Sequence, residues 1–211
     1  FNCVFGGNIP IGAGLSSSAA LEVGIGFALN TIFDFGISKS ELASIAQRAE
    51  HEFVGVKCGI MDQYANIYGE KNSALKIDCR SLTHTIYPMN PNVNIVLFNT
   101  GVSHNLASSE YNKRRTECAE GVKILRQWYP QITHLRDVTP GIIDQHRSAF
   151  DPIVYRRCLY VTEENIRVEK ACLALMQSDL RTLGHYLYES HEGLSKQYEV
   201  SCAELDFLVD T

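Results

Sequence analysis

The sequence lacks a long apolar segment, an excess of basic residues and a secretory-signal pattern. Its longest apolar run, Val23–Leu29, is far shorter than the roughly 20 residues that a membrane-spanning helix needs. Lys and Arg number 19 against 24 Asp and Glu, and the formal charge of −5 at pH 7 argues against nucleic acid or an anionic membrane as the main partner. No basic segment followed by an apolar stretch and a cleavage site opens the sequence, so no secretory leader is expected.

The sequence also has no Cys-x-x-Cys pair, although it holds seven cysteines. An odd count without close pairs favours reduced thiols, and hence the cytoplasm, over a disulfide framework or a zinc site. We expect each cysteine to be a small buried side chain. His51, His104, His185 and His191 are not spaced as a metal-ligand pair on a helix, so we expect them to be surface or capping residues.

Apolar patterns and turn residues divide the 211-residue chain into strands and helices. With 45% hydrophobic residues, the chain can bury a core as one domain or as two small ones. The strands are expected at residues 3–5, 74–79, 83–87 and 94–99, and the helices at 15–33, 38–53 and 151–177, with a shorter helix capped by Asp179.

A domain boundary is predicted near residue 91. The segment Pro88–Asn92 interrupts strand-forming sequence on both sides, and its two prolines cannot donate to a β ladder. Beyond this boundary the pattern predicts mostly helices. Arg114 and Arg115 could reach phosphate, but we expect them on a solvated helix face.

The segment Pro10–Ala20 has the composition of a phosphate-binding loop that opens into a helix. Gly12 and Gly14 allow a tight turn and a close approach to a ligand, and a helix N-terminus attracts anions. The serines that follow could cap the helix, donate to phosphate oxygens or place a hydroxyl on Mg²⁺. A serine-capped helix after a flexible loop explains the pattern equally well.

A second group of polar residues follows at the end of the next expected helix. Glu50 lies there, and Asp62 follows in the segment Cys58–Gln63. A carboxylate in such a loop can approach a reacting hydroxyl, and another one can hold a metal ion. The simpler alternatives are that Asp62 is a helix N-cap and that Glu50 is solvated.

Together these segments resemble the galactokinases, a family within the GHMP superfamily of small-molecule kinases. The segment Pro10–Ala20 fits the phosphate motif of the superfamily without a gap. The other matching segments are Glu50, Cys58–Gln63, Ile77–Leu82, Ser109–Asn112 with Arg114 and Arg115, Leu135–Val138 and Glu189–His191. The resemblance spans essentially the whole sequence.

The resemblance implies an α+β, GHMP-kinase-like architecture of two domains that is incomplete at both ends. Residues 1–90 would form part of an N-terminal domain of the ribosomal S5 domain 2-like kind, and residues 91–211 part of a ferredoxin-like, antiparallel α+β C-terminal domain. Galactokinases also carry an N-terminal sugar-binding signature and a C-terminal glycine-rich motif that this sequence lacks. We therefore expect a central part of a longer chain, with exposed sheet edges and with little or no turnover on its own.

The resemblance further implies ATP-dependent phosphorylation of galactose at its anomeric hydroxyl, with Mg²⁺ as cofactor. Asp62 would be the catalytic carboxylate, and Ser17 and Glu50 would hold the metal ion. Gly59 and Tyr111, together with Asp62, would contact the sugar. The residues implied at the ATP phosphates are Pro10, Gly12, Ala13, Gly14, Leu15, Ser16, Ser17, Ser18 and Ala19.

Other interpretations stay open at this point. The sugar could be a related one, such as N-acetylgalactosamine or arabinose. A kinase-like sensor that binds galactose and nucleotide without phosphoryl transfer is a further alternative, and so is an inactive truncated domain. The intact Asp62 and serine run argue against the sensor. We expect a monomer or a weak homodimer.

Overall fold

The computed structural model of the chain describes residues 2–12, 14–102 and 107–211. Its contacts form two compact units. Unit 1 comprises Phe1–Ile86 and Asn94–Ser108, and unit 2 comprises Tyr87–Val93 and Ser109–Thr211. The assignment of residues 1–90 and 91–211 to two kinase domains stays a prediction. No helix in the described ranges combines the length and the apolar character that crossing a membrane would require.

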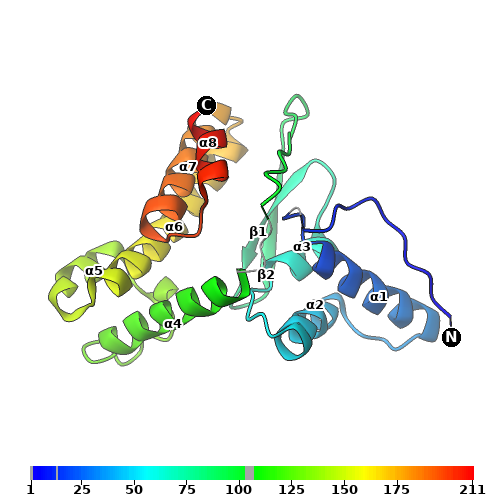
Figure 1. Cartoon of the computed structure of the whole chain (residues 1–211), viewed down its shortest axis with the longest axis horizontal. Helices are drawn as coiled ribbons and strands as arrows, with labels where there is room; N and C mark the ends of the chain where they lie inside the picture. Colours follow the sequence, from blue (N-terminus) through cyan, green and yellow to red (C-terminus); the bar gives the residue numbers. More distant parts are fainter. Residues whose placement is uncertain (1, 13, 103–106) are drawn as a thin grey trace. The chain divides into compact units, whose positions relative to one another are not determined.

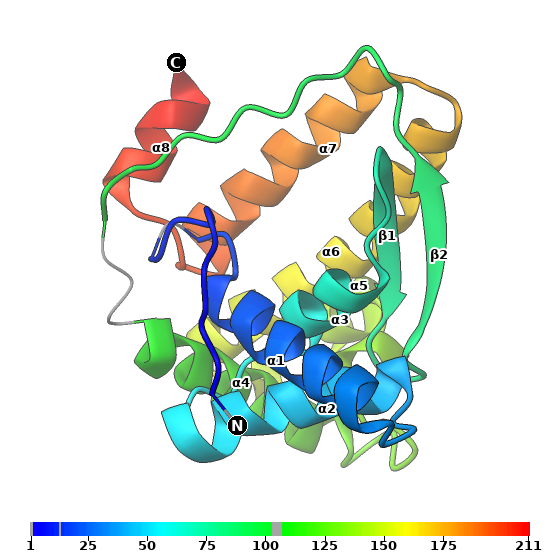
Figure 2. The ribbon, with the colours of Figure 1, turned by 90° about the vertical axis from the view of Figure 1, so that its right-hand side faces the viewer.

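Unit 1 packs three helices beside a two-stranded hairpin (Figures 1 and 2). Its elements are α1 (Ser17–Phe33), α2 (Lys39–Ala49), the π-helical turn η1 (Glu50–Val54), α3 (Met61–Tyr68), β1 (Ser73–Asp78) and β2 (Thr83–Pro88). These bounds confirm the predicted helices at 15–33 and 38–53 and the two strands that form the hairpin.

The start and the end of the second helical segment follow from local sequence. At the start, the N–H of Glu41 donates to Ser38 Oγ (3.3 Å) and the N–H of Ser38 donates to Glu41 Oε2 (2.9 Å). This reciprocal pair is a capping box, which satisfies two amides that the helix itself leaves unbonded. At the other end, Gly55 has φ +79°, a left-handed conformation that favours glycine.

The core of unit 1 centres on Tyr64 of α3, which is 1% exposed. Its hydroxyl donates to the carbonyl of Leu82 (2.8 Å) and contacts His84 Nδ1 (2.8 Å). Around it, Ala43 and Ile60 are also buried. Tyr64 therefore fixes α3 against the hairpin with both a polar and an apolar contact.

Two predicted strands are wrong, and so is the predicted burial of the cysteines other than Cys158. Residues 3–5 and 94–99 form no strand, because a strand needs a ladder partner and no other described segment pairs with them. The apolar side chains of 94–99 are correspondingly exposed, as Phe98 shows at 71%. Among the cysteines only Cys158 is buried, whereas Cys3 and Cys79 are exposed.

Unit 2 is built from helices in its described residues. They are α4 (Ala107–Leu125), α5 (Pro140–Gln145), α6 (Pro152–Met176), α7 (Leu180–Glu192) and α8 (Ala203–Asp210), with the short turns η2 (Leu135–Asp137), η3 (Arg147–Ala149) and η4 (Gly193–Gln197). The predicted long helix and its successor are confirmed. Asp151 and Asp179 cap them by accepting from the N–H groups of Ile153 and Thr182. In Figure 2, α6 and α7 lie side by side.

A buried arginine pair joins α4 and α6 to the segment that follows η4. Arg114, predicted on a solvated face, is only 4% exposed, so that prediction is wrong. It donates to the carbonyl of Tyr198 (2.6 Å) and to Glu117 (2.9 Å). Arg157, which is 1% exposed, donates to Glu117 (3.3 Å) and to Glu199 (2.6 Å). The acidic partners make the burial of two cations tolerable.

We expect Arg157→Leu to lower the free energy of unfolding by about 3 kcal/mol, the lower end of the range for a broken buried ion pair, because Arg114 still neutralises Glu117. The matched control is Arg156→Leu, since Arg156 is its neighbour in α6 but has a side chain that is 45% exposed and pairs at the surface. That change should cost less than about 1 kcal/mol. Urea unfolding of both variants measures the difference, and equal losses would contradict the structural role of Arg157.

Candidate active site

The loop before α1 has a backbone that glycine adopts most easily. Gly12 has φ +75° and Gly14 has φ +72°. A Cβ built at either position would meet no atom within 4 Å. Glycine is therefore favoured here by the left-handed backbone conformation, because a side chain would have enough room. Pro10 and Leu15 in the same loop are exposed. The predicted contact residue Ala13 lies outside the described residues.

The first turn of α1 leaves its amide groups available to a ligand. Ser16 precedes the helix with φ +51°, and its side chain makes no capping hydrogen bond. The serine-cap alternative is therefore wrong for Ser16. The N–H of Ala20 donates to the carbonyl of Ser16 (3.0 Å), so the three preceding amides, from Ser17 to Ala19, have no acceptor within the helix. Such a helix end binds anions.

Glu50 is withdrawn from water at the junction of α2 and η1. It is 8% exposed, so the expectation that it is solvated is wrong. Its carboxyl group interacts with that of Glu22, which comes from α1. Burial, and next the charge of Glu50, raise the pKa of the Glu22 carboxyl above its ordinary value. Two acidic side chains, one from α1 and one from the junction of α2 and η1, thus lie together.

Asp62 lies in the first turn of α3, where it is half-buried. The N-cap of α3 is Ile60, so the alternative that Asp62 serves as N-cap is wrong. The loop before it is held in place, because the carbonyl of Cys58 accepts from His51 Nε2 (2.9 Å) and from Gln47 Nε2 (3.2 Å). These two bonds tie the loop to the end of α2.

The pKa of the Cys58 thiol depends on several groups around this loop. Burial and then the charge of Glu50 raise its pKa, the amide of Gln63 lowers it, and the charge of Asp62 adds a smaller increase. Gln63 is itself only 1% exposed and also interacts with Glu22. Glu50, Asp62 and Gln63 therefore all act on the Cys58 thiol, and Glu50 and Gln63 also act on Glu22.

The other predicted sugar contacts are less closely defined. Gly59 lies exposed in the loop before α3. Tyr111 belongs to α4, and its side chain lies outside the described part of the structure. Its predicted contact with the sugar stays a prediction.

Two members of this site, Glu22 and Gln63, were not among the predicted residues. Glu22 is the only charged residue in α1, a helix that is otherwise apolar apart from serine, asparagine and threonine. A single charge in such a helix is the signal that could have identified it. Gln63 directly follows Asp62 and carries no comparable signal, because only the packing of α3 shows that its side chain is buried.

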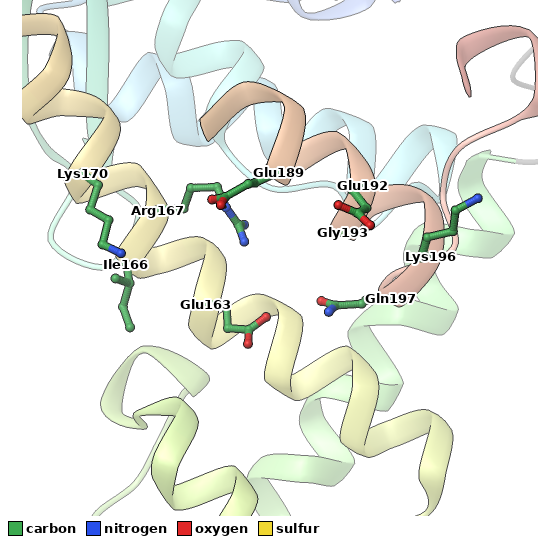
Figure 3. Close-up of a pocket in the computed structure, with 9 residues that line it drawn as sticks. All are labelled: Glu163, Ile166, Arg167, Lys170, Glu189, Glu192, Gly193, Lys196 and Gln197. Carbon is green, nitrogen blue, oxygen red and sulfur yellow. The ribbon is translucent and has the colours of Figure 1, made fainter. Parts of the chain in front are cut away.

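A cleft of about 460 Å³ in unit 2 contains none of the predicted site residues (Figure 3). Its walls come from α6 on one side and from α7 with η4 on the other. The lining residues are Glu163, Ile166, Arg167, Lys170, Glu189, Glu192, Gly193, Lys196 and Gln197. Arg167 is engaged by Glu164 and by Glu189 (3.4 Å). Because none of the predicted residues lines this cleft, the candidate site remains the one in unit 1.

Known proteins match both the sequence and the fold. Residues 1–70 match the family of GHMP kinases N terminal domain. The chain is 43% identical to the galactokinase of Roseiflexus sp. over 97% of its length and 52% of that relative. It is 45% identical to the galactokinase of Thermotoga maritima over 96% of its length and 56% of that relative.

A solved structure of Lactococcus lactis galactokinase complexed with galactose matches with a TM-score of 0.89 and 33% identity, over 96% of this chain and 52% of that one. These matches make the chain a homologue of the GHMP kinases. Within that superfamily its similarity is to the galactokinases, which confirms the resemblance and the α+β fold class expected from the sequence. The chain spans about half the length of the curated relatives it matches.

Glu50→Gln should increase the alkylation rate of Cys58 severalfold, because removing the neighbouring charge lowers the pKa of the thiol and raises its thiolate fraction. Mass spectrometry after iodoacetamide treatment at about pH 8 measures the rate, with the exposed Cys3 as internal reference. Glu52→Gln is the matched control, since Glu52 is exposed and pairs with Arg48 (3.2 Å). Equal Cys58 rates in the two variants would contradict the arrangement.

Proposed function

We propose that this chain carries the phosphoryl-transfer site of a galactokinase, which transfers the γ-phosphate of ATP to the anomeric hydroxyl of galactose and releases ADP. The main support is the N-terminal end of α1, whose first three amides have no acceptor within the helix. This end follows two left-handed glycines, and the same helix contributes Glu22 to the acidic group. A phosphate cradle beside carboxylates is the combination that phosphoryl transfer requires. The homologous proteins are galactokinases.

In this proposal the residues divide the work of the reaction. The loop and the amides from Ser17 to Ala19 bind the phosphates of ATP. Asp62 accepts the proton of the anomeric hydroxyl of galactose. The hydroxyl oxygen forms a bond to the γ-phosphorus of ATP while the bond between that phosphorus and the β–γ bridging oxygen breaks. Gly59 and Tyr111 contact galactose. Galactose 1-phosphate and ADP are the products.

The residues of the site also fit Mg²⁺, which prefers oxygen ligands. Ser17 and Glu50 would hold it, and buried oxygen atoms without hydrogen-bond partners lie beside Glu50. The ion supplies neutralisation of phosphate charge when bound. We further propose that residues 1–90 and 91–211 belong to the two kinase domains, that the protein is cytoplasmic, and that it is a monomer or weak homodimer.

Asp62→Asn should lower galactose-dependent ADP release by about 10²–10⁴-fold, the usual contribution of a positioned general base. Nucleotide binding should persist, because the phosphate loop is unchanged. The assay compares this chain with the product of the complete gene that encodes it, each with Mg²⁺ and ATP. Asp34→Asn is the control, since Asp34 is exposed at the end of α1 and asparagine tolerates its left-handed φ of +51°.

The outcomes separate the alternative functions. Activity of the complete product alone, lost with Asp62→Asn, supports a galactokinase whose site needs more than these 211 residues. Turnover of N-acetylgalactosamine or arabinose in place of galactose would change the substrate but keep the reaction. Binding of sugar and nucleotide without turnover would overturn the proposal in favour of a sensor.

A further inference from the structure

The acidic group beside α1 contains two buried oxygen atoms that have no hydrogen-bond partner in the described residues. They are Glu22 Oε2 and Gln63 Oε1. Both side chains interact with each other, and Glu22 also interacts with Glu50. An unpaired buried acceptor is unfavourable, so two of them in one place point to a site that binds a ligand.

A positive ion accounts for these atoms better than a shared proton does. One proton between Glu22 and Glu50 would relieve the repulsion of the two carboxylates, but it would leave the amide oxygen of Gln63 without a partner. All the unpaired atoms are oxygens, and carboxylate and amide oxygens are ligands of hard divalent cations. Among the described residues no three acidic, histidine or cysteine side chains converge as a complete metal cage. Mg²⁺ commonly takes one or two carboxylates and completes its shell with water and phosphate.

The position of Glu22 along α1 places such an ion next to the phosphate cradle. Glu22 follows Ser18 by four residues, so the two lie on the same face, about 6 Å apart along the helix axis. Glu50 and Gln63 approach this face from η1 and α3. The cluster therefore connects the helix that binds phosphate with the helix that carries Asp62.

We propose that Glu22 is a carboxylate ligand, alongside Glu50, of a divalent cation at the phosphate site, and that the amide oxygen of Gln63 faces the same ion. This inference rests on the proposed phosphoryl-transfer function and deepens it. It assigns the cation two carboxylates and one amide from three helical segments. It also explains why a charged residue is retained in the apolar helix α1.

The test is direct binding of Mn²⁺ to the 211-residue chain. Binding is measured as the decrease of the EPR signal of free Mn²⁺. Glu22→Gln, which keeps the size of the side chain, should weaken binding by about 10–100-fold, as does the loss of other groups that support metal sites. Glu50→Gln should weaken it in the same way. Glu52→Gln is the control and should bind as the wild type does, because it removes an equal charge at an exposed position.

Two results would overturn the proposal: equal Mn²⁺ affinity of Glu22→Gln and wild type, or no saturable binding by the wild type. Circular dichroism and the unfolding midpoint of each variant are recorded in parallel. A folded Glu22→Gln chain that binds Mn²⁺ weakly supports the site, and Gln63→Met provides a second variant that removes a ligand without changing charge. Because no sugar or ATP is present, Glu22-dependent Mn²⁺ binding stands even when the kinase assay fails. If the kinase assay succeeds but Mn²⁺ binding does not depend on Glu22, this inference is wrong and the proposed function stands.

Discussion

A carboxylate withdrawn from water needs a cation, a proton or hydrogen-bond donors, and in unit 1 Glu50 is such a carboxylate. It lies where α2 passes into the π-helical turn η1. The wider turn ends at Gly55, and the chain then returns so that the carbonyl of Cys58 meets donors on the segment it has just left. α3 begins from this fixed loop. The place of Asp62 therefore depends on the burial of Glu50 and on the turn that allows it.

The two units meet the cost of buried charge in different ways. In unit 2, Glu117 lies between Arg114 and Arg157, and the remaining guanidinium groups donate to backbone carbonyls and to the carboxylate of Glu199. The network is closed within the unit and needs nothing further. In unit 1, Glu22 and Glu50 face each other, and in the described residues neither forms an ion pair. A closed network serves stability, whereas an open one is characteristic of a binding site.

Local patterns predicted what local physics decides. The helix that begins near Ser38, the N-cap Asp179 and the two strands of the hairpin are decided within a few residues, and these elements are confirmed. The glycine spacing likewise identified the loop before α1. Segment 94–99 has strand-forming residues, but pairing depends on a neighbouring segment that its own sequence does not contain.

The site shows the same limit. Asp62 and Glu50 could be named from motifs, but the burial of Glu50 and the presence of Glu22 depend on the packing of α1 against α2 and α3. Arg114 reads as a surface residue in sequence, because the carbonyl groups it binds lie 84 and 85 positions away. A single sequence does not show which residues far apart along the chain contact each other.

The partners of the arginine pair also set an order of events during synthesis. Arg157 and Glu199 are 42 positions apart, so at 5–20 residues per second the ribosome needs about 2–8 s to supply the acidic partner after the basic one. During that interval α4 and α6 can come together only with part of their charge exposed to water. The ion-pair network around Arg157 is therefore complete only once Glu199 has been synthesised, and a pause in translation before Glu199 would leave Arg157 without that partner.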